Sequence, residues 1–191
     1  TTLDLELQKA AEASLSAELA TLERYQVSNG AALVVKPNTG EVLVMVGSKD
    51  YFDSENDGQV NVTLAERQPG SSIKPLMYAT AFQDKTLNPG SLLIDAPTCF
   101  TSAGQKPYCP KNYDGSYSGP VPVRRSLANS LNITAVKALR TLGVERFIEM
   151  ATALGITTWT DPSRYGLSLT LGGGEVRMID MAQAFGTLAN E

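Results

Sequence analysis

The sequence predicts an α+β protein in which helices and an antiparallel hairpin occupy separate stretches of the chain. Over the first two dozen residues, apolar side chains recur at near-helical spacing, which indicates an amphipathic helix. Two runs rich in β-branched residues then flank a Pro-Asn-Thr-Gly turn at residues 37–40, which favours a β-hairpin. From residue 121 onward the apolar spacing is helical again.

Composition narrows the possible functions. The 191 residues are 42% hydrophobic and 19% charged, with a net charge of −4, as in one globular domain or a large piece of one. A pI near 5.0 provides no basic surface for nucleic acid. The chain has no histidine, which excludes Ser-His-Asp and Cys-His catalysis and histidine-ligated metals. We expect acid–base chemistry from Lys, Tyr, Asp or Glu, with neither a metal nor a cofactor.

The start of the chain shows no targeting segment. Thr1 does not begin a signal peptide, and no apolar run approaches the length of a membrane span. We therefore expect the chain to start inside a longer polypeptide or after processing.

The first expected element is the N-terminal helix, with Thr2 or Asp4 as its cap. The hairpin lies within residues 30–47, and both of its strands are almost wholly apolar. Such strands need cover on both faces, so the hairpin requires more sheet than the chain visibly offers. The polar stretch 48–68 indicates a solvated connection, because its acidic residues miss the spacing of a calcium loop.

A Ser-x-x-Lys sequence follows at a helix start. Pro69 and Gly70 end the preceding segment, and an apolar run at 76–82 predicts a buried helix. Since Pro75 is tolerated only in a first helical turn, Ser71 should lie at the helix tip with Lys74 one turn along the same face. The positive helix end and burial should lower the pKa of Lys74, so that it can take the proton of the serine. The alternative is a serine cap beside a solvated lysine.

Residues 87–119 are rich in Pro, Gly, Ser and Tyr and predict a long ordered loop. The two cysteines of the chain, Cys99 and Cys109, lie within it. We expect a disulfide between them, which implies an oxidising compartment. Two free thiols are the alternative.

The remaining helices are expected at residues 124–128, 134–143, 145–154 and 178–188. The Gly-Gly-Gly run at 172–174 lacks the Gly-Lys-Ser/Thr of a phosphate loop and predicts a flexible turn. Between the first two of these helices, Ser130 could relay a proton from Lys74, and Asn132 could bind a substrate amide. The alternative is that Ser130 or Asn132 only caps the helix that follows.

Three runs together carry a resemblance to a known family: Gln68-Pro-Gly-Ser-Ser-Ile-Lys-Pro75, Lys111-Asn-Tyr-Asp-Gly115 and Ser126-Leu-Ala-Asn-Ser-Leu-Asn-Ile133. In this order they resemble the transpeptidase domain of a class A, bifunctional penicillin-binding protein. The resemblance implies the β-lactamase/transpeptidase-like fold, a helical subdomain plus an antiparallel sheet, with part of the sheet missing from this chain. Residues 1–191 would form one domain, incomplete at the C-terminus, with the helix and hairpin in 1–47 and both motifs in 70–191.

The resemblance also implies the chemistry. Ser71 matches the acylated nucleophile, Lys74 its general base, Ser130 the proton relay and Asn132 the substrate-amide ligand. The implied reaction is peptidoglycan D,D-transpeptidation on stem peptides that end in D-Ala-D-Ala, and β-lactams would acylate the same serine. The parent protein would be extracytoplasmic, anchored in the cell membrane beside a glycosyltransferase domain.

One departure from the family concerns its third motif, Lys-Thr/Ser-Gly, which is absent from these 191 residues. We expect that motif in a C-terminal segment supplied in cis or as a second chain, and we expect residues 1–191 alone to be inactive. A serine β-lactamase or a D,D-carboxypeptidase would share the first two motifs. A non-catalytic module with the penicillin-binding fold is the alternative outside enzymes.

Overall fold

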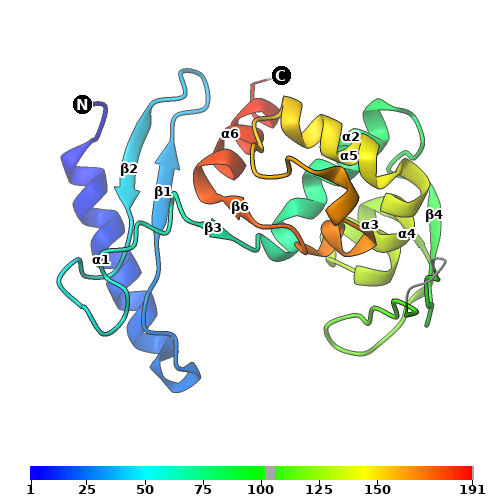
Figure 1. Cartoon of the computed structure of the whole chain (residues 1–191), viewed down its shortest axis with the longest axis horizontal. Helices are drawn as coiled ribbons and strands as arrows, with labels where there is room; N and C mark the ends of the chain where they lie inside the picture. The colour runs from blue at the N-terminus through cyan, green and yellow to red at the C-terminus, as the bar shows by residue number, and fades with distance from the viewer. Residues whose placement is uncertain (102–105, 191) are drawn as a thin grey trace. The chain divides into compact units, whose positions relative to one another are not determined.

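A computed structural model describes residues 1–101 and 106–190 (Figure 1). The chain divides into two compact units. The first unit comprises Thr1–Gln68, Thr152–Thr160 and the segment from Glu175 onward. The second unit comprises Pro69–Ala151 and Asp161–Gly174.

The first unit opens with helix α1, Leu5–Leu22, followed by a 3-10 turn, η1, at Glu23–Tyr25. Asp4 caps α1, since its carboxylate accepts from the backbone N–H groups of Glu6 and Leu7 at 3.0 and 3.1 Å. Thr2, the other candidate cap, instead donates its hydroxyl to the Val42 carbonyl at 2.7 Å. The sequence therefore placed the cap within two residues, and the structure selects Asp4.

The hairpin consists of β1, Ala32–Val35, and β2, Val42–Val46, paired antiparallel. Helix α1 contacts both strands, and the Gln8 carboxamide donates to and accepts from the Met45 backbone at 3.2 and 3.0 Å. Helix α6, Met178–Leu188, contacts β1. Much of the cover that the apolar strands require thus comes from helices, although Val34 stays 42% exposed.

The stretch 48–68 is a largely exposed connection built from turns. Ser48 donates its hydroxyl to the Gly58 carbonyl at 2.6 Å, which closes the turns between them. The stretch then forms strand β3, Glu66–Arg67, which pairs antiparallel with β6, Val176–Arg177. The expectation of a solvated connection is confirmed, since Gly58 and Thr63 alone are buried among residues 48–68 and both residues of β3 are exposed. The strand itself was not predicted, because a short polar strand gives no apolar alternation to detect.

The second unit is built around helix α2, Lys74–Gln83, which follows a 3-10 turn, η2, at Gly70–Ile73. Helix α2 contacts α3, α4 and the 3-10 segment η4. The bounds are Val123–Ala128 for α3, Asn132–Leu142 for α4 and Leu167–Leu171 for η4. Helix α5 spans Val144–Ala153, and the 3-10 turn η3 spans Pro162–Arg164. The buried face of α2 and the turn before it has no solvent exposure at Ile73, Leu76, Met77, Tyr78 and Ala81. The helices predicted from the sequence are thus present, and α6 has the predicted bounds.

The expected long loop contributes to a third two-stranded sheet. Strand β4, Leu92–Asp95, pairs antiparallel with β5, Gly119–Pro122. A bridge also joins Phe100 and Tyr108, and Cys99 and Cys109 form a disulfide beside it. Residues 102–105 of the loop lie outside the described residues. The sequence interpretation was wrong about β4 because its apolar run is short and is surrounded by turn-forming residues.

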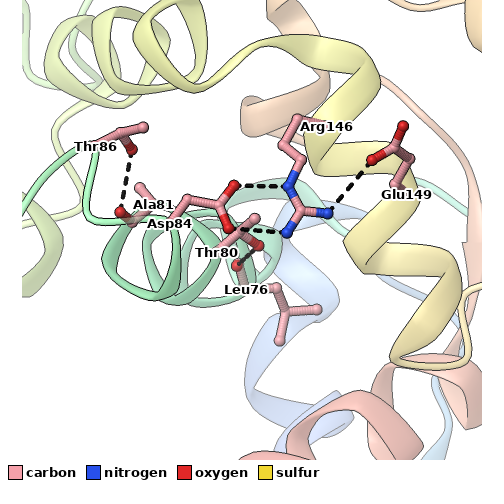
Figure 2. A network of polar contacts seen from close by, with 7 residues as sticks. All are labelled: Leu76, Thr80, Ala81, Asp84, Thr86, Arg146 and Glu149. Atoms are coloured by element: carbon pink, nitrogen blue, oxygen red, sulfur yellow. Dashed lines mark hydrogen bonds and ion pairs between the residues drawn. The ribbon is translucent and has the colours of Figure 1, made fainter.

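An ion pair fixes the far end of α2 (Figure 2). The Arg146 guanidinium donates to the two carboxylate oxygens of Asp84 at 2.6 and 2.8 Å, and it also reaches Glu149 at 3.4 Å. The hydrogen bond from Arg146 lowers the pKa of Asp84. This contact ties α5 to the residue that ends α2 and lies away from Lys74 at the start of the helix.

Within the described ranges, no helix has both the length and the apolar character that crossing a membrane would require.

Candidate active site

Ser71 lies in the turn η2, directly before α2, as the Pro-Gly and Pro75 positions predicted. Its side chain is exposed. The neighbouring Ser72 closes the turn by donating its hydroxyl to the Pro69 carbonyl at 2.6 Å. The nucleophile candidate is therefore presented at a helix entrance and is not used to cap the helix.

The glycine run at 172–174 packs against the turn that contains Ser71. Gly172 has a φ of +87°, and a side chain there would overlap the backbone nitrogen of Gly70. Gly70 is itself in a left-handed conformation, with a φ of +58°. The two backbones therefore meet without side chains between them. The turn predicted at 172–174 is present, with Gly172 ending η4 in a left-handed conformation, and Gly172 is in addition a packing position.

Lys74 is buried, with 1% of its surface exposed. Its amine donates to the Ser130 carbonyl at 2.6 Å, the Ser130 hydroxyl at 3.0 Å and the Asn132 side-chain oxygen at 2.7 Å. All three acceptors are uncharged, and burial lowers the pKa of Lys74 to about 8. The structure thus brings the two motifs together and contradicts the alternative of a solvated lysine.

The expected contact between Lys74 and Ser71 is not present. Among the described residues, no hydrogen bond joins the Lys74 amine to the Ser71 hydroxyl, whereas the contact with Ser130 is made. The physical reason is that an ammonium group has three donors, and all three are used by Ser130 and Asn132. A neutral amine keeps two donors and gains a lone pair, so deprotonation releases one of these bonds.

Ser130 and Asn132 do not cap the helix that follows them. The N-cap position of α4 is Leu131, and the Asn132 side chain instead bridges the Lys74 amine and the Lys111 carbonyl, the latter at 2.8 Å. Ser130 has a φ of +51°, in the left-handed region. Ser130 therefore takes an unfavourable backbone conformation with its carbonyl on the Lys74 amine.

Ser71, Ser130 and Asn132 line one cavity of about 550 Å³, and Tyr113 and Arg125 lie on its wall. The amine of Lys74 bonds two of these lining residues from the buried side. Within residues 1–101 and 106–190, no cluster of three or more carboxylate or thiol ligands could hold a metal ion. The cavity lining therefore offers hydroxyl and amide groups beside the Lys74 amine, together with the Arg125 guanidinium and the Asp114 carboxylate.

Sequence reasoning missed two residues of this site, Asn112 and Asp95. Asn112 accepts the backbone N–H of Asn132 at 2.8 Å, and its own amide donates to the buried Asp95 carboxylate at 2.9 and 3.0 Å. Asn112 belongs to one of the three family-like runs, but nothing local showed what it binds. Its partners lie on other segments of the chain, which a local pattern does not reveal.

Comparison with known proteins identifies the family of this chain. The family model of the penicillin binding protein transpeptidase domain matches residues 30–190. Penicillin-binding protein 2D of Bacillus subtilis is 37% identical over 192 residues, which cover 100% of this chain and 26% of that protein. Penicillin-binding protein 1C of Escherichia coli is 34% identical over 99% of this chain and 24% of its own length. The chain thus spans about a quarter of these relatives.

Solved structures show the same fold. The chain superposes on penicillin-binding protein 1A of Haemophilus influenzae with a TM-score of 0.75 and 32% identity, over 85% of this chain and 23% of that one. It also superposes on PBP2 of Pseudomonas aeruginosa with a TM-score of 0.80 and 21% identity, over 99% of this chain and 50% of that one. The second likeness concerns the fold alone. From the family model and these relatives, the chain belongs to the penicillin-binding protein transpeptidase family.

Proposed function

We propose that this chain carries the acylation centre of a peptidoglycan D,D-transpeptidase, with Ser71 as nucleophile. The observation that carries the proposal is the buried Lys74 amine, which touches only neutral oxygens of the second motif. Because its pKa is about 8, about one tenth of this amine is neutral at pH 7. A base with a pKa close to the working pH is suited to proton transfer.

In the first half-reaction, the neutral Lys74 amine takes the Ser71 hydroxyl proton as the serine oxygen bonds the carbonyl carbon of the penultimate D-Ala. The resulting tetrahedral intermediate collapses by breaking the C–N bond to the terminal D-Ala. The leaving amine receives the Ser130 hydroxyl proton, and Lys74 returns its proton to Ser130 through the 3.0 Å contact. The product is an ester on Ser71 and free D-Ala.

In the second half-reaction, an amino group of a neighbouring stem peptide attacks the ester carbon. Its proton passes back through Ser130 and Lys74, the C–O bond to Ser71 breaks, and the serine oxygen regains a proton. A new amide then cross-links the two stem peptides. A β-lactam ring would enter the first half-reaction in place of the D-Ala-D-Ala terminus and leave Ser71 acylated. Asn132 would hydrogen-bond the substrate amide once it releases Lys74 or Lys111.

A β-lactamase activity is less well supported, since it requires a base for a hydrolytic water. Among the described residues that line the cavity, the one carboxylate belongs to Asp114. Ser116 donates to it through its hydroxyl at 2.5 Å and through its backbone N–H at 3.0 Å, which lowers the pKa of Asp114. A carboxylate with a lowered pKa is a poor acceptor of a water proton.

The cellular setting is part of the proposal. The disulfide between Cys99 and Cys109 suits an oxidising compartment, and the class A relatives suggest a membrane anchor and a glycosyltransferase domain in the same polypeptide. The partners would be peptidoglycan stem peptides and β-lactams.

Labelling by a fluorescent penicillin tests the proposal in the full-length protein. We expect one stable adduct, located by mass spectrometry on the peptide that contains Ser71, and no labelling of Ser71→Ala. Ser72→Ala is the matched control, because Ser72 precedes the same helix but its hydroxyl is bonded to Pro69. Equal labelling of Ser71→Ala would refute the assignment of the nucleophile. Rapid turnover of a chromogenic cephalosporin would identify a β-lactamase instead.

A further inference from the structure

We propose that Asn112 is a positioning residue for the second motif and that the buried Asp95 sets its orientation. The proposal rests on the function proposed above, because Asn112 would act through Asn132 on the Lys74 amine. Asn112 is 6% exposed and Asp95 is fully buried. Among the described residues, neither Asn112 nor Asp95 hydrogen-bonds to Ser71 or Lys74, so both would act by supporting the site.

Helix α4 needs an acceptor at its start. The first N–H groups of a helix have no partner inside the helix, and a polar N-cap side chain normally accepts them. The N-cap residue of α4 is Leu131, whose side chain has no polar atom. The Asn112 side-chain oxygen accepts the N–H groups of Asn132 at 2.8 Å and Ile133 at 3.4 Å in its place. A residue 20 positions upstream thus caps the helix that carries the second motif.

The orientation of the Asn112 carboxamide is fixed from the other side. Its NH₂ group donates to both Asp95 oxygens at 2.9 and 3.0 Å and to the Ser116 carbonyl at 2.8 Å. Rotating the carboxamide by half a turn would face its oxygen to the carboxylate and its NH₂ group to the α4 N–H donors. Both contacts would be repulsive, so only the observed orientation satisfies every group.

Asp95 can hold this position because its own oxygens are satisfied by neutral donors. It is the last residue of β4, and it also accepts the Ser118 backbone N–H at 2.8 Å. Within the described part of the chain, no lysine or arginine forms a salt bridge with it. A buried carboxylate that is held by hydrogen bonds alone is strongly destabilised when one of its donors is lost. Asp95 therefore depends on the NH₂ group of Asn112.

The same segment supports Asn132 twice. Asn112 holds its backbone N–H, and the Lys111 carbonyl accepts from its side-chain NH₂ group at 2.8 Å. With both fixed, the Asn132 side-chain oxygen is directed to the Lys74 amine at 2.7 Å. Loss of the Asn112 contact would therefore displace an acceptor of the general base without removing any group that reacts.

A charge exchange tests the inference in the full-length protein. Asn112→Asp places two carboxylates within contact distance, and we expect it to lower the limiting rate of penicillin acylation roughly 10–100-fold, with a smaller change in the half-saturating concentration. The double variant Asp95→Asn/Asn112→Asp restores one donor between the positions and an oxygen facing α4. We expect its acylation rate to recover to within about threefold of the rate of the unaltered protein. The bond from residue 112 to the Ser116 carbonyl is not replaced in this variant. Asp95→Asn alone serves as the milder variant if Asn112→Asp does not fold.

Asp84→Asn is the control for general destabilisation, because the Arg146–Asp84 pair stabilises the same unit away from the site (Figure 2). It should lower the melting temperature and leave acylation unchanged. Loss of acylation only in proportion to the unfolded fraction, or failure of the double variant to recover, would overturn the positioning role.

Hydrogen exchange separates this inference from the proposed function. The backbone amides of Asn132 and Ile133 should exchange faster in Asn112→Ala than in the unaltered protein, whatever the activity of the enzyme. Unchanged exchange at both amides would refute the capping role. Absence of penicillin labelling in the unaltered protein would instead refute the proposed function.

Discussion

Arg146 and Lys74 are both held by hydrogen bonds of 2.6 to 3.4 Å, yet the acceptors differ in charge. Arg146 faces the carboxylates of Asp84 and Glu149, which raise its pKa further above its usual range. Lys74 faces neutral oxygens only, and burial lowers its pKa to about 8. Burial without a carboxylate partner, rather than bond length, thus separates a cation that can give up its proton from a structural one.

The largest effect should come from removing the base. Lys74→Met and Lys74→Arg each leave Ser71 without a proton acceptor, since methionine has none and arginine stays charged. We expect acylation by a fluorescent penicillin to fall by roughly 10³-fold or more in stopped-flow or gel-based assays. Lys85→Met is the matched control, because Lys85 lies beyond the far end of the same helix. Acylation of Lys74→Arg at a normal rate would contradict the assignment of the base.

The pH dependence of acylation should follow the neutral amine. The neutral fraction rises about tenfold per pH unit below pH 8 and levels off above it, so the rate should rise about 100-fold from pH 6 to pH 9. The same lowered pKa affects stability. Between about pH 8 and pH 10.5 Lys74 is protonated in the unfolded chain and neutral in the folded chain, so the contribution of Lys74 to the free energy of unfolding increases as pH rises. A flat rate profile across this range would show that Lys74 is not the titrating group.

Giving Lys74 a carboxylate partner should make it resemble Arg146, a cation that keeps its proton. Asn132→Asp places a carboxylate at the 2.7 Å contact, which favours the ammonium form and raises the pKa of Lys74 by at least about one unit. Acylation at pH 7 should fall roughly tenfold, and part of the loss should return at higher pH. Asn129→Asp controls for charge in the same cavity without contact to Lys74. A loss that is equal at every pH would point to substrate binding alone.

The smallest effect on the reaction is expected from Asp84→Asn, which breaks the structural pair. Thermal unfolding followed by circular dichroism should show a modest fall in melting temperature, with the acylation rate at 25 °C unchanged within about twofold. Because Arg146 lowers the pKa of Asp84, its contribution is present above the usual aspartate pKa and is lost as pH falls through the lowered value. The difference between variant and unaltered protein should therefore vanish in acid.

The sequence predicted what depends on local chemistry. Helix spacing and the Pro75 position placed Ser71 before α2 and buried Lys74, and the helix at 178–188 has the predicted bounds. Reasoning from local sequence was wrong where contacts with distant segments determine the structure. It assigned β4 to a loop, because pairing with β5 rather than residue pattern makes it a strand.

The polar network shows the same division. The capping of α1 by Asp4 is local and was among the predicted caps, whereas the capping of α4 by Asn112 crosses 20 residues and was not. The donors of Lys74 were expected to reach Ser71 as well, but Ser130 and Asn132 saturate them. Which of several possible acceptors a lysine uses depends on the tertiary arrangement of all of them.

The contact between Gly172 and Gly70 has a consequence for the order of folding. The turn that presents Ser71 packs against a segment made about a hundred residues later, so this packing cannot form until that segment has left the ribosome. During synthesis the nucleophile is therefore present before the backbone that holds it in place. Any reactivity that depends on this packing would appear only after almost the whole second unit has been made.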